Sequence, residues 1–123
     1  MPTDLPPAII CQAPVAVDGD SVRCANIGKL VRMAGIDAPE LPGHCRRGRV
    51  CAPGDGAASK AALAELLARG PVFITPSGRD KYGRIVARVT AGQVDLSCKM
   101  ITLGKAIPRY TPLDCKRRLS TKP

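Results

Sequence analysis

Six cysteines in a chain of 123 residues constrain the fold of this protein more than any other feature of its sequence. An even and high number of cysteines in so short a chain indicates disulfide bonds. A structural zinc site is disfavoured, because no two cysteines form a Cys-x-x-Cys pair and His44 is the single histidine. We therefore expect a small disulfide-stabilised domain. The cysteines are Cys11, Cys24, Cys45, Cys51, Cys98 and Cys115.

Disulfides place such a chain in an oxidising compartment, so we expect it to be secreted or periplasmic. The opening stretch, MPTDLPPAII, lacks the basic-then-apolar build of a signal peptide, and we expect that Met1 stands in place of a removed export signal. No apolar run approaches the roughly 20 residues that span a bilayer. We expect a monomer that does not associate with membranes.

The length suits one domain, residues 1–123, with no internal repeat or linker to divide it. The sequence contains 19 Lys and Arg against 10 Asp and Glu, a net charge of +9. Such an excess attracts polyanions, above all nucleic acids, although an anionic membrane surface would be attracted too.

The first half of the sequence predicts a β-meander followed by a long loop. Residues 9–17 are apolar and β-compatible, DGDS (18–21) supplies a turn, and VRCANI (22–27) continues extended. Residues 30–36 predict a third strand. The stretch 41–56, LPGHCRRGRVCAPGDG, is rich in Gly, Pro and Arg, and its length suggests a functional loop.

Two helices are predicted in the second half. The first is AASKAALAELLARG, with Asp55 as its cap and Gly70 at its end. The second begins near Asp95 and stops at Gly104. The residues expected on the buried face of the first helix are Ala58, Ala62, Leu63, Leu66 and Leu67.

Residues 72–75 and 84–91 predict two further strands, with Phe73 in the core, and residues 112–123 predict a basic, weakly structured tail. Five strands in an antiparallel order with a helix after the third correspond to an OB-type Greek-key barrel of the α+β class. Such barrels commonly bind oligonucleotides on one face.

Charged residues lie where phosphodiester chemistry would need them. VRMAGIDAPE (31–40) places Arg32, Asp37 and Glu40 close together, Asp20 lies in the hairpin turn, and Arg84 opens the strand predicted over residues 84–91. Carboxylates suit a hard cation such as Ca²⁺, and arginines suit bidentate phosphate contacts. Taken alone, Asp20 is better explained as a turn residue, and Asp37 as a strand terminator and Glu40 as a solvated loop charge are open alternatives. Arg32 interrupts an apolar strand and requires an anionic partner.

The segments DGDS, VRMAGIDAPE and GRDKYGR (78–84), in this order, resemble the three signature segments of the thermonuclease family, the staphylococcal nuclease-like proteins. The resemblance extends over residues 9–110. It implies an OB barrel with helices and a Ca²⁺-dependent nuclease that acts on DNA and RNA, with single strands preferred. Cleavage on the 5′ side of the phosphate would leave 3′-phosphate ends.

The resemblance also implies which residues bind the metal and activate water. Asp20 and Asp37 match the direct calcium ligands, and Ala38 matches the residue whose backbone carbonyl completes the set. Glu40 matches the carboxylate that holds the attacking water.

Five further positions match residues that contact the substrate. Arg32 and Arg84 match the arginines that stabilise the transition state at phosphorus. Lys81 and Tyr82 match residues that contact a terminal phosphate, and Tyr110 matches a tyrosine beside the base. Tyrosines as ordinary core filler are the alternative.

The cysteines depart from the best-known family members, which lack them. Cross-strand positions on the first hairpin suggest Cys11–Cys24, proximity suggests Cys45–Cys51, and the pairing left over is Cys98–Cys115. This is one of many pairings that six cysteines allow. Relatives usually have a third helix at the C-terminus, which we expect to be missing here, and a Cys98–Cys115 bridge could anchor the tail in its place.

Within the Cys45–Cys51 loop, Arg46, Arg47 and Arg49 could steer substrate phosphates beside Glu40, or could merely make the loop soluble. We expect His44 to be an exposed loop residue and not a ligand. The sequence leaves these two interpretations of the arginines equally open.

Arg32 and Asp37 are five residues apart, so a regular strand would place them on opposite faces. We predict that Gly35 marks a bulge or sharp bend that returns both side chains to one site. A non-catalytic OB-fold nucleic-acid-binding module is the main alternative function, and a small basic protein that acts on membranes or other proteins is a third. The enzyme is favoured, because a binding module would not need Asp20, Asp37 and Glu40, which would repel phosphate in the absence of a metal.

Overall fold

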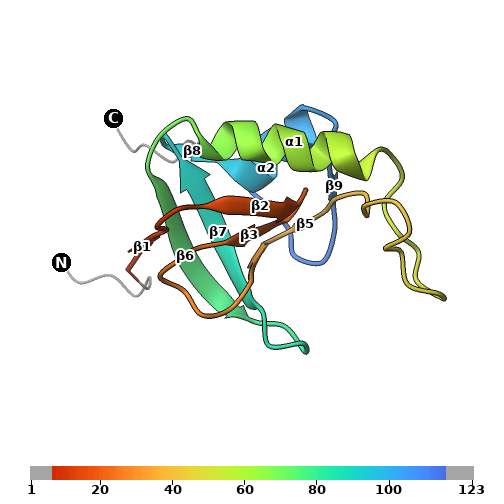
Figure 1. Cartoon of the computed structure of the whole chain (residues 1–123), viewed down its shortest axis with the longest axis horizontal. Helices are drawn as coiled ribbons and strands as arrows, with labels where there is room; N and C mark the ends of the chain where they lie inside the picture. The colour runs from red at the N-terminus through yellow and green to blue at the C-terminus, as the bar shows by residue number, and fades with distance from the viewer. Residues whose placement is uncertain (1–6, 116–123) are drawn as a thin grey trace.

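A computed structural model describes residues 7–115 of the chain. Most of the strands form one mixed sheet that curls into a half-barrel (Figure 1). A separate pair, β5 and β9, lies beside it. In sheet order the strands are β1 (Ile9–Ile10), β6 (Val72–Arg79), β7 (Ile85–Ala91), β4 (Val31–Met33), β3 (Ser21–Arg23) and β2 (Val15–Asp18), with β8 (Val94–Asp95) beside β7; the separate pair is β5 (Ile36–Asp37) and β9 (Ile107–Pro108).

The prediction of an OB-type α+β architecture is confirmed, but the purely antiparallel strand order is wrong. Strand β4 runs parallel to β7, with Arg32 opposite Val86. A parallel pair requires a long crossover connection. Here the segment between β4 and β7, which contains α1 and β6, provides it. Strand β6 also extends to Arg79 and does not end at Thr75, because a register shift between Pro76 and Gly78 accommodates the proline.

The bend predicted at Gly35 is confirmed. Strand β4 ends at Met33, a turn follows, and β5 begins at Ile36. Gly35 has a φ of 80°, and an added Cβ would lie 2.5 Å from the side chain of Leu113. A residue with a side chain is disfavoured at that φ, so glycine is what permits the turn.

Two helices pack on the sheet, α1 (Gly56–Leu67) and α2 (Leu96–Thr102), and α1 lies across the end of the half-barrel near β2 (Figure 1). Asp55 and Asp95 cap them by accepting hydrogen bonds from Ala58 N (3.1 Å) and Cys98 N (3.1 Å). The described part of the chain contains no third helix. None of its helices is long and apolar enough to cross a membrane.

The buried face of α1 differs in part from the prediction. Leu63, Leu66 and Leu67 are buried as expected, whereas Ala58 and Ala62 are only half-buried. Ser59 is buried in their place because its hydroxyl donates a hydrogen bond of 2.7 Å to the carbonyl of Lys105.

Phe73 was expected in the core, but it is half-buried and is not part of the core cluster. Strand alternation explains this, because Val72 and Ile74 on either side of it point inward.

All three disulfides pair as expected: Cys11–Cys24, Cys45–Cys51 and Cys98–Cys115. They are compatible with a secreted or extracellular protein. The third joins α2 to the segment after β9, as expected of an anchor for the C-terminal region. The basic tail predicted for residues 112–123 lies mostly outside the described residues.

Candidate functional site

The turn between β2 and β3 carries Asp20 into the interior. Gly19 makes this possible, because an added Cβ would lie 2.6 Å from Cβ of Ala38 and 2.7 Å from Cβ of Ser59. At that close approach, the backbone N–H of Ala38 donates a hydrogen bond of 2.8 Å to Asp20 Oδ2. This hydrogen bond therefore links the DGDS segment directly to the VRMAGIDAPE segment.

Arg32 on β4 lies between two carboxylates. Its Nη1 is 3.1 Å from Asp20 Oδ2, and its Nη2 is 3.6 Å from Asp37 Oδ1. The Nη1 contact is an ion pair by distance but is not directed as a hydrogen bond, and among the described residues this buried atom has no hydrogen-bond partner. A buried donor of this kind favours an additional anion beside it.

Burial raises the pKa of Asp20 to about 7, because the carboxylate is removed from water. The positive charge of Arg32 opposes this rise, and the nearby Asp18 adds to it. Arg32 alone therefore does not offset the effect of burial on Asp20, and a further cation beside this carboxylate would stabilise its charged form.

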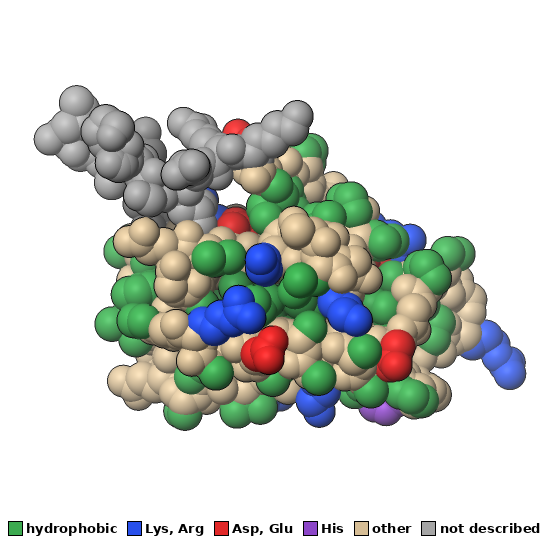
Figure 2. Space-filling model, turned by 90° about the horizontal axis from the view of Figure 1, so that it is seen from above, with side chains coloured by type: hydrophobic (Ala, Val, Ile, Leu, Met, Phe, Trp, Pro, Cys, Tyr) green, Lys and Arg blue, Asp and Glu red, His purple; other side chains and the backbone are tan. Residues whose placement is uncertain are grey.

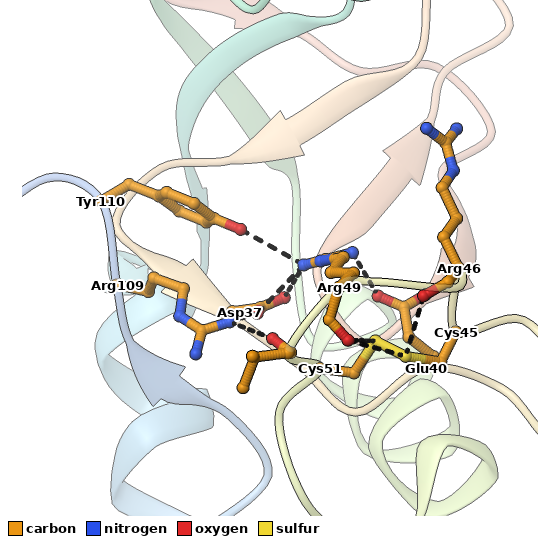
Figure 3. The surroundings of a disulfide bond; sticks show 9 residues. Asp37, Glu40, Cys45, Arg46, Arg49, Cys51, Arg109 and Tyr110 are labelled. Carbon is orange, nitrogen blue, oxygen red and sulfur yellow. Dashed lines mark hydrogen bonds and ion pairs between the residues drawn. A yellow bond between two sulfur atoms is a disulfide. The ribbon is translucent and has the colours of Figure 1, made fainter.

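Asp37 on β5 is fully buried and is surrounded by arginines (Figure 3). Arg49 Nη2 donates to both of its oxygens, at 3.0 and 3.1 Å, and Arg109 Nη1 donates to Oδ2. The same guanidinium of Arg49 reaches Glu40 Oε2 through Nη1 (2.8 Å) and the hydroxyl of Tyr110 through Nη2 (3.2 Å). Neither Arg49 nor Arg109 is predicted from the sequence as a partner of these carboxylates.

The Cys45–Cys51 disulfide positions Arg49 (Figure 3). It closes a short ring that contains Arg49, and Arg109 Nη1 donates a hydrogen bond of 3.0 Å to the carbonyl of Val50 inside that ring. Arg109 therefore holds both the loop and Asp37.

A second group of cations surrounds Tyr82, in the turn between β6 and β7. The guanidinium carbon atoms of Arg46 and Arg84 lie 5.0 and 5.3 Å from the ring centroid, and Lys81 Nζ lies at 5.3 Å. Arg46 Nη1 also donates to the Tyr82 hydroxyl at 3.3 Å. Three cations around one exposed ring form a site suited to phosphate groups.

Asp80 orients this turn and was missed by the sequence analysis. It accepts hydrogen bonds from Tyr82 N (2.9 Å), Arg84 N (3.0 Å) and Arg84 Nε (2.6 Å). Burial alone would raise the pKa of Asp80, but the hydrogen bonds from Arg84 and Tyr82 outweigh it and lower the pKa below its usual 3.8. The nearby carboxylate in the GRDKYGR segment could have suggested a partner for Arg84.

One cavity of about 900 Å³ connects the two groups. Asp37 and Ala38 lie beneath its surface and do not line it. The predicted site residues that do line the cavity are Asp20, Arg32, Glu40, Lys81, Tyr82, Arg84 and Tyr110.

The face seen in Figure 2, on the α1 side, carries Lys and Arg interspersed with Asp, Glu and hydrophobic side chains.

Oxygen-only side chains suit a hard cation, and Asp20 and Asp37 approach one guanidinium from two sides. Within residues 7–115, no group of three or more His, Cys, Asp and Glu side chains is arranged to hold a metal ion. The oxygen atoms of Asp20 and Asp37 are of the type that calcium prefers. The remaining ligands would have to be backbone carbonyls, water or substrate.

Comparison with known proteins gives one family. Residues 30–119, more than half of the chain, match the family model described as staphylococcal nuclease homologue. The match contains VRMAGIDAPE and GRDKYGR and leaves out DGDS. No curated protein matches the sequence.

Proposed function

The chain belongs to the family of staphylococcal nuclease homologues, and from that premise we propose that it is a calcium-dependent nuclease that hydrolyses the phosphodiester bonds of DNA and RNA. The observation that carries the proposal is the convergence of Asp20 and Asp37 on Arg32. Arg32 Nη1, a buried donor without a hydrogen-bond partner among the described residues, could donate to a phosphate oxygen.

Asp20, Asp37 and the carbonyl of Ala38 would hold the calcium ion, which when bound supplies positive charge to the scissile phosphate. Glu40, at the edge of the cavity, would accept a proton from the attacking water. Arg32 and Arg84 would donate hydrogen bonds to the phosphoryl oxygens, where negative charge develops in the transition state.

The group around Tyr82 would bind a neighbouring phosphate of the strand through Lys81 and Arg46, and Tyr110 would lie beside a base. The exposed rings of Tyr82 and Tyr110 support this, since base stacking favours accessible aromatic faces. Cleavage on the 5′ side of the phosphate, with 3′-phosphate products, completes the proposal.

A second candidate is a non-catalytic nucleic-acid-binding module. One observation favours it: Arg49 neutralises Asp37 and Glu40, and Arg109 also pairs with Asp37, so these carboxylates need no metal in order to lie in or beneath a phosphate-binding cavity. The two candidates differ in whether the protein cleaves the nucleic acid that it binds, with Glu40 required for cleavage in the first and serving only structure in the second.

The test is to incubate the oxidised protein with single-stranded DNA, with calcium, without it, and with chelator, and to identify the product ends. Glu40→Gln should bind DNA nearly as well as the parent while its kcat falls by orders of magnitude. Glu65→Gln, on the exposed side of α1, is the matched control and should keep full activity. Calcium-independent binding without cleavage, in protein with intact disulfides, would favour the binding module.

A further inference from the structure

The loop after Glu40 inserts one of its own arginines into the carboxylate cluster (Figure 3). We propose that the Cys45–Cys51 loop holds Arg49 as an internal cation on Asp37 and Glu40, and that a divalent cation binds these carboxylates only when Arg49 leaves them. This regulation rests on the proposed function, because it concerns the same carboxylates that would bind calcium and activate water.

Occupancy is the first argument. The Arg49 guanidinium uses Nη2 on both oxygens of Asp37 and Nη1 on Glu40 Oε2. Those oxygens are the ones that a metal and an activated water would require. A guanidinium and a divalent cation repel one another and compete for the same lone pairs, so they cannot both bind Asp37 in this arrangement.

The second argument is the solvent exposure of Arg49. The side chain of Arg49 is 35% exposed and belongs to a loop without regular secondary structure, whereas that of Asp37 is 0% exposed on β5. Arg32 cannot leave in the same way, because its side chain is only 10% exposed and its backbone lies within the sheet. The side chain of Arg109 is 30% exposed, but its Nη1 donates to both Asp37 Oδ2 and the carbonyl of Val50, and its backbone N–H donates to the carbonyl of Gly35 at 2.9 Å. Arg49 is therefore the partner of Asp37 that can move away into solvent.

The disulfide is the third argument. A short ring keeps the guanidinium close to the carboxylates after each departure, which raises its effective concentration there. The hydrogen bond from Arg109 to Val50 fixes the ring beside Asp37. Opening the ring should lower that effective concentration and favour the metal.

The test measures calcium affinity by isothermal titration calorimetry, in the absence of nucleic acid. Arg49→Gln should bind calcium roughly tenfold more tightly than the parent protein, in the range typical of coupling between two competing ligands. Arg47→Gln is the control, because it removes the same charge from the same loop and no ion pair of Arg47 is found among the described residues. It should shift the affinity much less.

Equal affinities for the Arg49→Gln and Arg47→Gln variants would overturn the competition while leaving the proposed nuclease intact. Failure of every variant to bind calcium would instead overturn the calcium-dependent function, and the competition with it. Far-ultraviolet circular dichroism of each variant establishes that the compared proteins are folded.

The tether is tested with Cys45→Ser/Cys51→Ser. This double variant should bind calcium severalfold more tightly in the parent background and should have no further effect in the Arg49→Gln background. Equal tightening in both backgrounds would refute a role for the ring in holding Arg49.

Discussion

Replacing Gly56 by alanine should disturb catalysis although Gly56 has no side chain and touches no substrate. Gly56 is the first residue of α1 and packs against the backbone of Glu40. An added Cβ would lie 2.1 Å from the carbonyl oxygen of Glu40 and 2.8 Å from Leu41 N. Because both are backbone atoms, no side-chain rotation relieves the overlap, and the two segments must separate by about 1 Å.

The magnitude follows from that displacement. Overpacking of a tight contact usually costs about 1–3 kcal/mol, so the free energy of unfolding of Gly56→Ala should fall by that amount. A catalytic group misplaced by about 1 Å loses up to about 100-fold in rate. We expect kcat to fall by about that factor while the affinity for DNA, which depends mainly on the arginines and lysines, changes little.

The assay pairs urea unfolding with kcat on single-stranded DNA in calcium. Gly28→Ala is the matched control, because nothing lies within 4 Å of an added Cβ there and Gly28 does not line the cavity. A Gly56→Ala protein with parental urea midpoint and parental kcat would refute the argument that the start of α1 sets the position of Glu40.

Three further predictions concern separate parts of the molecule. Arg84→Ala should lower kcat on DNA by about 100-fold or more, since a lost donor to the transition state costs about 2.7–4 kcal/mol, whereas Arg88→Ala on the exposed side of β7 should not; equal rates would remove Arg84 from the chemistry. Because the pKa of Asp80 is lowered below 3.8 in the folded protein, the stabilising contribution of its carboxylate is present above pH 3.8 and is lost as the pH falls further. The difference in unfolding free energy between the parent and Asp80→Asn should therefore shrink below pH 3.8. A constant difference in urea titrations would contradict this. Cys98→Ser/Cys115→Ser removes a bridge between residues 17 apart and should cost about 3 kcal/mol in urea unfolding, whereas an unchanged midpoint would mean that the bridge does not anchor the C-terminal region.

Local signals in the sequence were sufficient for several elements. Asp55 and Asp95 predicted the starts of both helices because a helix cap is a contact between neighbours in sequence. Gly35 was predicted from parity alone, since two side chains an odd number of residues apart cannot share a strand face without a bend. Among the disulfides, Cys11–Cys24 followed from the hairpin and Cys45–Cys51 from proximity, which left Cys98–Cys115.

Non-local contacts were beyond the sequence. The parallel pairing of β4 with β7 depends on how the α1 crossover folds back, and no residue of either strand specifies it. Likewise Arg49 is one of three arginines in its loop, and nothing in the sequence distinguishes the one that reaches Asp37 from the others. Their roles depend on the ring geometry and on Arg109, which is distant in sequence.

The distribution of positive charge in the site links these observations. Among residues 7–115, Asp37 has three arginines around it, Arg32, Arg49 and Arg109, whereas Asp20 pairs with Arg32 alone and has a pKa raised to about 7. Charge is therefore in excess at one carboxylate and deficient at the other. A cation placed between them would correct the deficit at Asp20 but would add to the excess at Asp37 unless a guanidinium withdrew. The charge imbalance requires that one guanidinium withdraw, and the position of Arg49 in the exposed Cys45–Cys51 loop makes Arg49 the one that we expect to move.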